Sequence, residues 1–138
     1  LPATLGTQMA DPNRRNILLI GDGSLQLTVQ ELSTMIRQDI KPIIFVINND
    51  GYTVERLIHG MEETYNDIRM WDYKALPKVF GGNNVVVHDV KTSNDLQNVF
   101  DAINAAPEQL HFTEVTMKWD DAPAKLRDIS KAFAAQNK

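Results

Sequence analysis

The sequence predicts an α/β domain: a parallel sheet with helices on both faces. Short apolar runs alternate with segments of helical periodicity, which is the order of strand and crossover that a parallel sheet needs. The apolar runs are also continuous, as expected for strands buried on both faces. With 138 residues, the chain has the usual size of a single domain, and we expect one domain over residues 1–138.

The first half of the chain alternates helix and strand. Residues 1–10 carry small side chains, and their Pro2 suits a first helical turn. The continuous apolar run Ile17–Ile20 predicts a buried strand. Leu25–Arg37 has apolar residues at a helical period and predicts one helix. The β-branched and aromatic run Pro42–Ile47 predicts a second strand.

The alternation continues in the second half. Tyr73–Phe80 is expected to form a short helix, because two glycines follow it. Val85–Val87 predicts a third strand, and Ser93–Ala106 a helix that opens on a capping serine. Leu110–Met117 predicts a fourth strand. Asp121–Gln136 is expected to be the last helix, with apolar residues along one side.

Polar glycine-containing segments follow the first two strands. The first motif, Gly21–Ser24, comes directly after one strand, and the second motif, Asn48–Gly51, directly after the next. The second opens a long stretch, residues 48–72, that we expect to be irregular. Ligands of open parallel sheets bind at the carboxyl ends of the strands, and long ordered loops there are usually functional. A ligand site is therefore expected at this edge.

The first motif places Asp22 where a phosphate-binding turn would be. It lacks the third glycine of a dinucleotide fingerprint and the lysine of a P-loop. An ordinary strand-to-helix turn with an exposed aspartate is the alternative. A bound Mg²⁺ would reconcile the carboxylate with a phosphate, while Gly21 and Gly23 would let the backbone approach that phosphate.

The second motif could supply further oxygen ligands from amide side chains and a glycine carbonyl. A β-hairpin is the alternative, because Asn-Gly and Asp-Gly steps favour tight turns between antiparallel strands. Two features weaken that reading: Ile43–Ile47 is apolar on both faces, and Thr53–Ile58 alternates poorly. A receiver-like or flavodoxin-like phosphate domain is a third option, but the acidic cluster and later lysine of a receiver are not found.

Together the two motifs resemble a known cofactor signature. GDGS, followed one helix and one strand later by NN, is similar to the thiamine-diphosphate motif of thiamin-dependent enzymes. The longer text GDGSLQLTVQELSTMIRQDIKPIIFVINNDGYTVERLIHG looks like the 2-keto acid decarboxylases, especially bacterial indolepyruvate-type or branched-chain-type enzymes. YNDIRMWDYKALPKVFGG and DAPAKLRDISKAFAAQNK also resemble that group.

The resemblance covers essentially the whole chain and implies the later part of the third, C-terminal domain of such enzymes. The expected fold is therefore the thiamine-diphosphate-binding fold, truncated at its N-terminal side. The glutamate that activates the cofactor and a pair of active-site histidines lie in the first domain of that family. We expect His59, His88 and His111 to be scattered surface or packing residues instead, because they lack metal-ligand spacing.

The resemblance implies thiamine diphosphate and Mg²⁺ as cofactors. The metal would be bound by Asp22, the Asn49 side chain and the Gly51 carbonyl. Gly23 and Ser24 would hold the diphosphate, and Gly21 would be a requirement of the turn. The residues expected to contact the cofactor are Asp22, Gly23, Ser24, Asn49, Gly51, Tyr52, Thr53 and Val54.

Catalysis is assigned to Glu55, because decarboxylases of this group carry a glutamate directly after the GYT-plus-aliphatic sequence. Burial near the cofactor is expected to favour its protonated form. An exposed glutamate at a helix start is the alternative. Val54, Ile129 and Phe133 are expected to shape the substrate pocket, although Ile129 and Phe133 could instead pack in a core.

The implied function is that of a carboxy-lyase whose full-length form converts indolepyruvate, or other aromatic or branched 2-keto acids, to aldehydes and CO₂. One alternative is that the isolated chain is a non-catalytic cofactor-binding module. Another is a carboligating parent that resembles acetolactate synthase, although those enzymes differ after the NN pair and so lack the match at Glu55. The family forms homodimers and homotetramers.

Composition makes some partners unlikely. The net charge is -4 with no basic block, which disfavours nucleic acid and anionic membrane surfaces. No run approaches the roughly 18 apolar residues of a membrane span. There are no cysteines, which fits a reducing compartment, and we expect a cytoplasmic protein.

Overall fold

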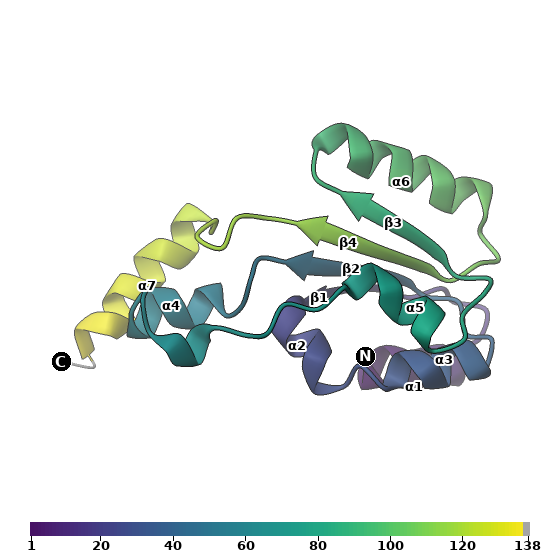
Figure 1. Ribbon diagram of the computed structural model, residues 1–138, viewed down its shortest axis with the longest axis horizontal. Coiled ribbons are helices and arrows are strands. Elements are labelled where there is room, and N and C mark those ends of the chain that lie inside the picture. Colours follow the sequence, from purple (N-terminus) through teal and green to yellow (C-terminus); the bar gives the residue numbers. More distant parts are fainter. Residues whose placement is uncertain (137–138) are drawn as a thin grey trace.

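A computed structural model describes residues 1–136, so residues 137 and 138 of the predicted domain lie outside the described part. The described residues form a four-stranded sheet in the order β1-β2-β4-β3, and every neighbouring pair is parallel (Figure 1). The strands are β1 (Ile17–Gly21), β2 (Ile43–Asn48), β3 (Val86–Val90) and β4 (His111–Thr116). The predicted fold class is confirmed.

Helices lie on both faces of the sheet and beyond its carboxyl edge (Figure 1). One face carries α1 (Pro2–Ala10), α2 (Asp22–Leu27), α3 (Glu31–Arg37) and α5 (Leu76–Val79). The other face carries α6 (Ser93–Ala105). Past the strand ends, α4 (Thr53–His59) packs against α7 (Ala124–Gln136). The short 3₁₀ helices are η1 (Thr64–Asn66) and η2 (Tyr73–Ala75).

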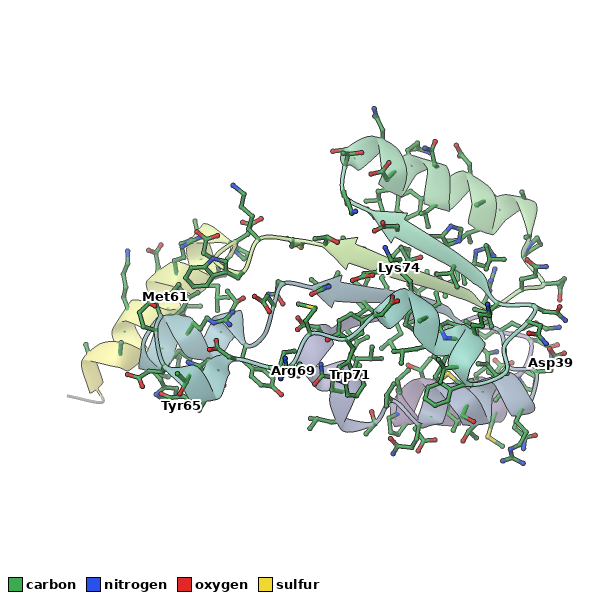
Figure 2. The ribbon with its side chains drawn as sticks, viewed as in Figure 1. Asp39, Met61, Tyr65, Arg69, Trp71 and Lys74 are labelled. Atoms are coloured by element: carbon green, nitrogen blue, oxygen red, sulfur yellow. The ribbon has the colours of Figure 1, made fainter. Side chains whose placement is uncertain are left out.

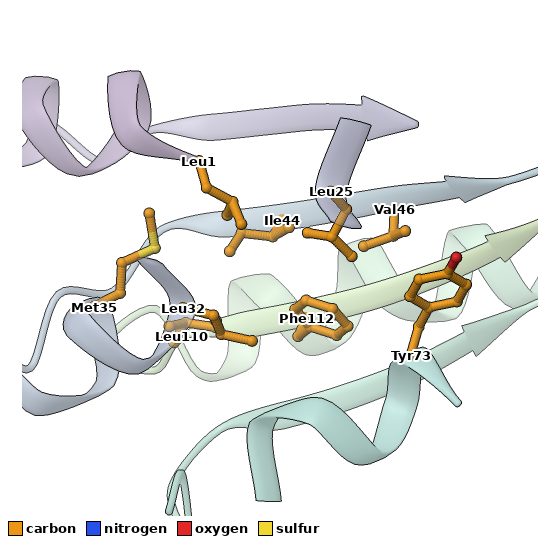
Figure 3. Packing of buried hydrophobic residues seen from close by; sticks show 9 residues of the cluster. All are labelled: Leu1, Leu25, Leu32, Met35, Ile44, Val46, Tyr73, Leu110 and Phe112. Carbon is orange, nitrogen blue, oxygen red and sulfur yellow. The ribbon is translucent and has the colours of Figure 1, made fainter. Parts of the chain in front are cut away.

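The larger core lies between the sheet and the first three helices (Figure 3). Its buried members are Leu1, Leu25, Leu32, Met35, Ile44, Val46, Tyr73, Leu110 and Phe112. Burying each such side chain stabilises the fold by about 1.5–3 kcal/mol relative to exposure. This core fixes α2, and therefore the start of the first motif, against the end of β1.

The opposite face is only partly covered. Helix α6 begins with a capping box between Thr92 and Asp95 and packs Val99 and Ile103 on the sheet. It does not reach β1, where Ile17 and Leu19 are 67% and 70% exposed. These two side chains lie on the same sheet face as Ile43 and Phe45, their partners in the register.

The prediction of one helix over Leu25–Arg37 is wrong. The helix breaks at Thr28–Gln30, giving α2 and α3, and α2 already begins at Asp22. Thr28 has a non-helical backbone (φ -140°), and the β-branched pair Thr28–Val29 lowers helix propensity. The apolar period runs on through the break and therefore hides it.

The stretch 48–72 is less irregular than predicted, because it contains α4 and η1. The hairpin alternative is also wrong: Thr53–His59 is helical, and β2 lies between two parallel neighbours. Two boundaries shift as well. The third strand runs over Val86–Val90, and the last helix begins at Ala124.

Two of the histidines are paired rather than scattered. The rings of His88 and His111 stack 5.2 Å apart, and His88 Nε2 lies 2.9 Å from His111 Nδ1. His111 Nε2 lies 2.9 Å from the Ala106 carbonyl, which can only accept. His111 therefore donates to Ala106 and accepts from His88. Burial lowers the pKa of His88, and nearby His111 lowers it further. The pair has the packing role predicted for these residues, because it ties the end of α6 to the sheet.

No helix in the described part of the chain combines the length and the apolar character needed to cross a membrane.

Candidate cofactor site

The two motifs are in direct contact at the carboxyl edge of the sheet. Gly21 pairs with Ile47 in the β1–β2 register, so the motifs leave neighbouring strands at the same level. The Gly51 N–H donates to Asp22 Oδ2 across 3.0 Å. This bond joins residues 29 apart in sequence and brings together the two halves of the predicted signature.

Asp22 is a buried carboxylate with unused acceptor capacity. It is 1% exposed, and its Oδ1 accepts the Gly23 N–H at 2.7 Å. Within residues 1–136, no Lys, Arg or His nitrogen lies within 4.0 Å of it. A buried charge without a counter-ion is unfavourable, and a carboxylate offers about four lone-pair positions. A divalent cation beside Asp22 therefore fits the chemistry of this site.

The second motif contains neutral oxygens that are potential ligands. Asn49 Nδ2 donates to Thr53 Oγ1 at 2.7 Å, which commits the amide nitrogen to the protein and leaves Oδ1 as a potential ligand. The Gly51 carbonyl accepts the Thr53 N–H at 3.2 Å and retains a second lone pair.

A carboxylate, an amide oxygen and a main-chain carbonyl are the hard ligands that Mg²⁺ prefers. No group of three or more His, Cys, Asp or Glu that could hold a metal occurs among the described residues. A metal at this edge would therefore rely on Asp22 together with neutral oxygens. That is the type of ligand set predicted from the sequence, and the assignment of Asp22, Asn49 and Gly51 stays a prediction.

The two glycines of the first motif differ from expectation. A Cβ on Gly23 would lie 2.5 Å from Tyr52 Cε1, so the missing side chain makes room for the Tyr52 ring. Gly21 has an ordinary extended backbone (φ -69°) and open space around it. The expectation that Gly21 is required by the turn is therefore wrong. Ser24 is exposed at the start of α2, where a ligand can reach its hydroxyl.

Of the residues that follow the second motif, Thr53 is buried and Val54 is exposed. Thr53 is 5% exposed, and its hydroxyl donates to the Trp119 carbonyl at 2.7 Å while it accepts from Asn49. It therefore supports the second motif from behind. Val54 is 46% exposed and is available to a ligand.

Glu55 is half exposed, with Oε2 3.3 Å from His59 Nε2. The expected burial of this carboxylate is not found, because α4 extends beyond the sheet edge (Figure 1). Glu55 instead lines an open pocket of about 560 Å³ with Tyr52, His59, Tyr65 and Asn66. Figure 2 shows Tyr65 in this region, at the end of the molecule opposite Asp39. The catalytic role of Glu55 stays a prediction.

The predicted pocket residues of α7 are not part of either core cluster. Ile129 is 46% and Phe133 50% exposed. Simple core packing, the alternative for these two, is therefore wrong in this chain. They remain available to a substrate, on a helix that packs against α4.

Three buried polar residues near the motifs were missed from the sequence. Glu114 accepts from Asn48 Nδ2 at 2.6 Å, which anchors the second motif to β4. Burial raises the pKa of Tyr73, a hydrogen bond from Gln26 opposes the rise, and Asp22 and other carboxylates add to it. The third residue, Arg56, contacts the second motif directly. The one available signal was a glutamate in the middle of a predicted strand.

Comparison with known proteins identifies the family. Residues 1–114 match the family model described as "Thiamine pyrophosphate enzyme, C-terminal TPP binding domain". The chain belongs to this family. The predicted thiamine-diphosphate-binding fold is confirmed, and thiamine diphosphate, the cofactor expected from the sequence, is the one for which the family is named.

Similar proteins carry the name of a decarboxylase. The chain is 51% identical to the pyruvate decarboxylase of Aspergillus fumigatus over 128 residues, which are 91% of this chain and 22% of that protein. It is 46% identical to pyruvate decarboxylase isozyme 2 of Saccharomyces cerevisiae over 138 residues, which are 99% of this chain and 24% of that protein. The resemblance to thiamin-dependent 2-keto acid decarboxylases is confirmed. The chain spans about a quarter of the length of these relatives.

Proposed function

We propose that this chain is the cofactor-binding part of a thiamine-diphosphate-dependent 2-keto acid decarboxylase, a carboxy-lyase that releases CO₂ and an aldehyde. The observation that carries the proposal is the Asp22–Gly51 contact, which unites the two motifs around a buried carboxylate without a cationic partner among the described residues. The names of the relatives support the reaction class.

In this proposal Asp22, Asn49 and the Gly51 carbonyl would hold Mg²⁺, and Gly23 and Ser24 would hold the diphosphate. The bound cofactor supplies the electron sink for loss of CO₂. Glu55 moves a proton at the mouth of the open pocket, and its neighbour His59 lies within ion-pair distance of it.

The substrate side chain is proposed to contact Val54, Ile129 and Phe133, which are apolar and about half exposed on two helices in contact. Contact with these three apolar side chains would favour an aromatic or branched 2-keto acid such as indolepyruvate. The relatives' names favour pyruvate as the second candidate. We place the full-length protein in the cytoplasm as a homodimer or homotetramer. The isolated chain is expected to be a non-catalytic module, because Glu55 stays open to solvent in it.

The test is a panel of pyruvate, branched-chain 2-keto acids and indolepyruvate, given to the full-length protein with thiamine diphosphate and Mg²⁺. CO₂ and aldehyde should appear in equal amounts, and chelation of Mg²⁺ should abolish both. Acetolactate as the main product would contradict the decarboxylase proposal. Higher kcat/KM for pyruvate than for every larger substrate would contradict the substrate proposal alone.

A further inference from the structure

Arg56, on α4, is a buried cation beside the second motif. The residue is 4% exposed, although arginine is rarely so buried without a specific contact. Its Nη2 donates to the main-chain carbonyl of Asp50 at 2.7 Å and to Asp67 Oδ1 at 2.9 Å. The Asp67 side chain is 64% exposed, so the buried end of this interaction lies at the Asp50 carbonyl.

The backbone that Arg56 contacts has an unusual conformation. Asp50 has a φ of 58° and Gly51 a φ of 110°. A non-glycine residue in the left-handed region persists where surrounding contacts hold it. A Cβ on Gly51 would lie 3.0 Å from Arg56 Nη2 and 2.5 Å from the Asn66 carbonyl. Arg56 and Asn66 therefore enclose the residue whose carbonyl is a predicted metal ligand.

Arg56 also contacts the segment that leads into α7. Its guanidinium carbon lies 5.3 Å from the centroid of the Trp119 ring, within the range of a cation–π interaction. Trp119 lies between β4 and α7. The main chain of Trp119 accepts from Thr53, which in turn accepts from Asn49. Two chains of contacts therefore join the second motif to Trp119.

The hydrogen bonding of Arg56 is incomplete. Nη1 is buried and has no partner among the described residues, and the side chain borders a small pocket of about 220 Å³ with Met61, Glu62 and Trp119. An unpaired nitrogen on a buried cation lowers stability, so a contribution to folding does not explain why Arg56 is buried. Buried polar groups that are left without a partner tend to lie at functional sites.

We propose that Arg56 is a positioning residue. It holds the second motif in its metal-binding conformation and, through Trp119, links occupancy of the metal site to the order of α7. Mg²⁺ and diphosphate binding therefore stabilises the helix that carries Ile129 and Phe133. The identity of the ligand rests on the proposed function, and the contacts of Arg56 do not.

The test compares three variants in the full-length protein: Arg56→Met, which keeps the apolar stem, Arg56→Lys, which keeps the charge, and Asp67→Asn as the matched control. Calorimetry with Mg²⁺ at saturating thiamine diphosphate gives the metal affinity. Hydrogen exchange of the α7 amides, with and without both ligands, measures whether ligand binding stabilises α7, and this measurement does not depend on activity.

Arg56→Met should weaken Mg²⁺ binding at least tenfold and remove most of the ligand-induced protection of α7. Arg56→Lys should recover part of the affinity but little of the protection, because it lacks the planar group that stacks on Trp119. Asp67→Asn should stay within threefold of wild type, since the Arg56–Asp50 contact remains.

Binding by Arg56→Met within twofold of wild type would overturn the positioning role. Should that variant not fold, Trp119→Ala tests the link between the metal site and α7. This variant should lose the ligand-induced protection of α7 and keep its Mg²⁺ affinity within threefold of wild type. Unchanged protection in Trp119→Ala would overturn the link. Failure of the wild-type protein to bind Mg²⁺ and thiamine diphosphate would instead overturn the proposed function, and the inference with it.

Discussion

The first and second motifs occupy equivalent places, each at the end of a parallel strand, but they are built differently. The first motif passes from an extended Gly21 directly into α2 and uses no left-handed residue. The second motif contains left-handed Asp50 and Gly51 and is held by Thr53 and Arg56 of α4, with Asn66 of η1 close to Gly51. Thr53 and Arg56 in turn contact Trp119.

The difference indicates that the first motif mainly contributes to ligand binding, whereas the second motif contributes to both ligand binding and stability. The conformation of the first motif follows from a local strand-to-helix connection, so a change there should alter ligand binding with little effect on folding. The second motif depends on distant contacts, so a change there should alter ligand binding and stability together. Each of the following substitutions tests that distinction.

Asp22→Asn should have the largest effect on binding. The amide keeps the shape of the side chain but removes the anionic ligand, so Mg²⁺-dependent binding of thiamine diphosphate should fall by about 100-fold or more. This loss exceeds the roughly 10–100-fold that is typical when a residue hydrogen-bonded to a metal ligand is replaced. The stability of the ligand-free protein should change little, because removing an uncompensated buried charge offsets the loss of one of the two hydrogen bonds from Gly23 and Gly51, which the amide NH₂ cannot accept. Calorimetry and urea unfolding measure the two effects, with Asp39→Asn at the opposite end of the sheet as the control.

Gly51→Ala should destabilise the fold by about 2–4 kcal/mol, since it combines a left-handed backbone with a Cβ placed 2.5 Å from the Asn66 carbonyl. Mg²⁺ affinity should fall with stability. Urea unfolding checks this, with Gly6→Ala in α1 as the control: nothing lies near Gly6, and the change should stabilise by about 0.5–1 kcal/mol. A Gly51→Ala protein of wild-type stability would remove the distinction between the motifs.

Thr53→Val should cost about 1–3 kcal/mol of unfolding free energy, because it leaves the Asn49 amide and the Trp119 carbonyl without their buried partner. Thr53→Ser keeps the hydroxyl and should recover most of that loss. Thermal unfolding of the two variants gives the comparison. A Thr53→Val protein as stable as wild type, with the loss confined to Thr53→Ser, would show that packing of the methyl group, rather than hydrogen bonding, is what matters.

Gly23→Ala should destabilise the fold by only about 1–2 kcal/mol, because the Tyr52 ring must shift. Gly21→Ala should be neutral within about 0.5 kcal/mol, since its backbone suits any residue and its surroundings are open. A crystal structure of Gly23→Ala should show Tyr52 displaced. Larger damage from Gly21→Ala than from Gly23→Ala would contradict this account of the first motif.

The sequence predicted β1 and β2 well, because each is a continuous apolar run, although β1 is exposed on the face that α6 does not reach. It did not show the break at Thr28–Gln30, where Leu25, Val29 and Leu32 continue the apolar period across a non-helical residue. It also missed α4, because seven residues with Arg56 buried among them show no clear apolar face.

The candidate site could also be predicted only in part. Asp22 and Asn49 could be found from motif spacing alone. Glu114 and the Thr53–Trp119 bond could not, because each depends on the pairing that brings β4 beside β2. Arg56 could not either, because its burial depends on the path of the chain around α4. Thr53 and Trp119 are 66 residues apart in sequence. The exposure of Glu55 follows from how far α4 extends beyond the sheet, which no local pattern records.

The hydrogen bond between Asp22 and Gly51 also has a consequence for the order of folding. It closes a loop that contains α2, α3 and β2, so it can form only after these elements have come together. During refolding, the Gly51 amide should therefore become protected from exchange later than the amides within β2. The ligand site is therefore expected to form after the strands on which it is built.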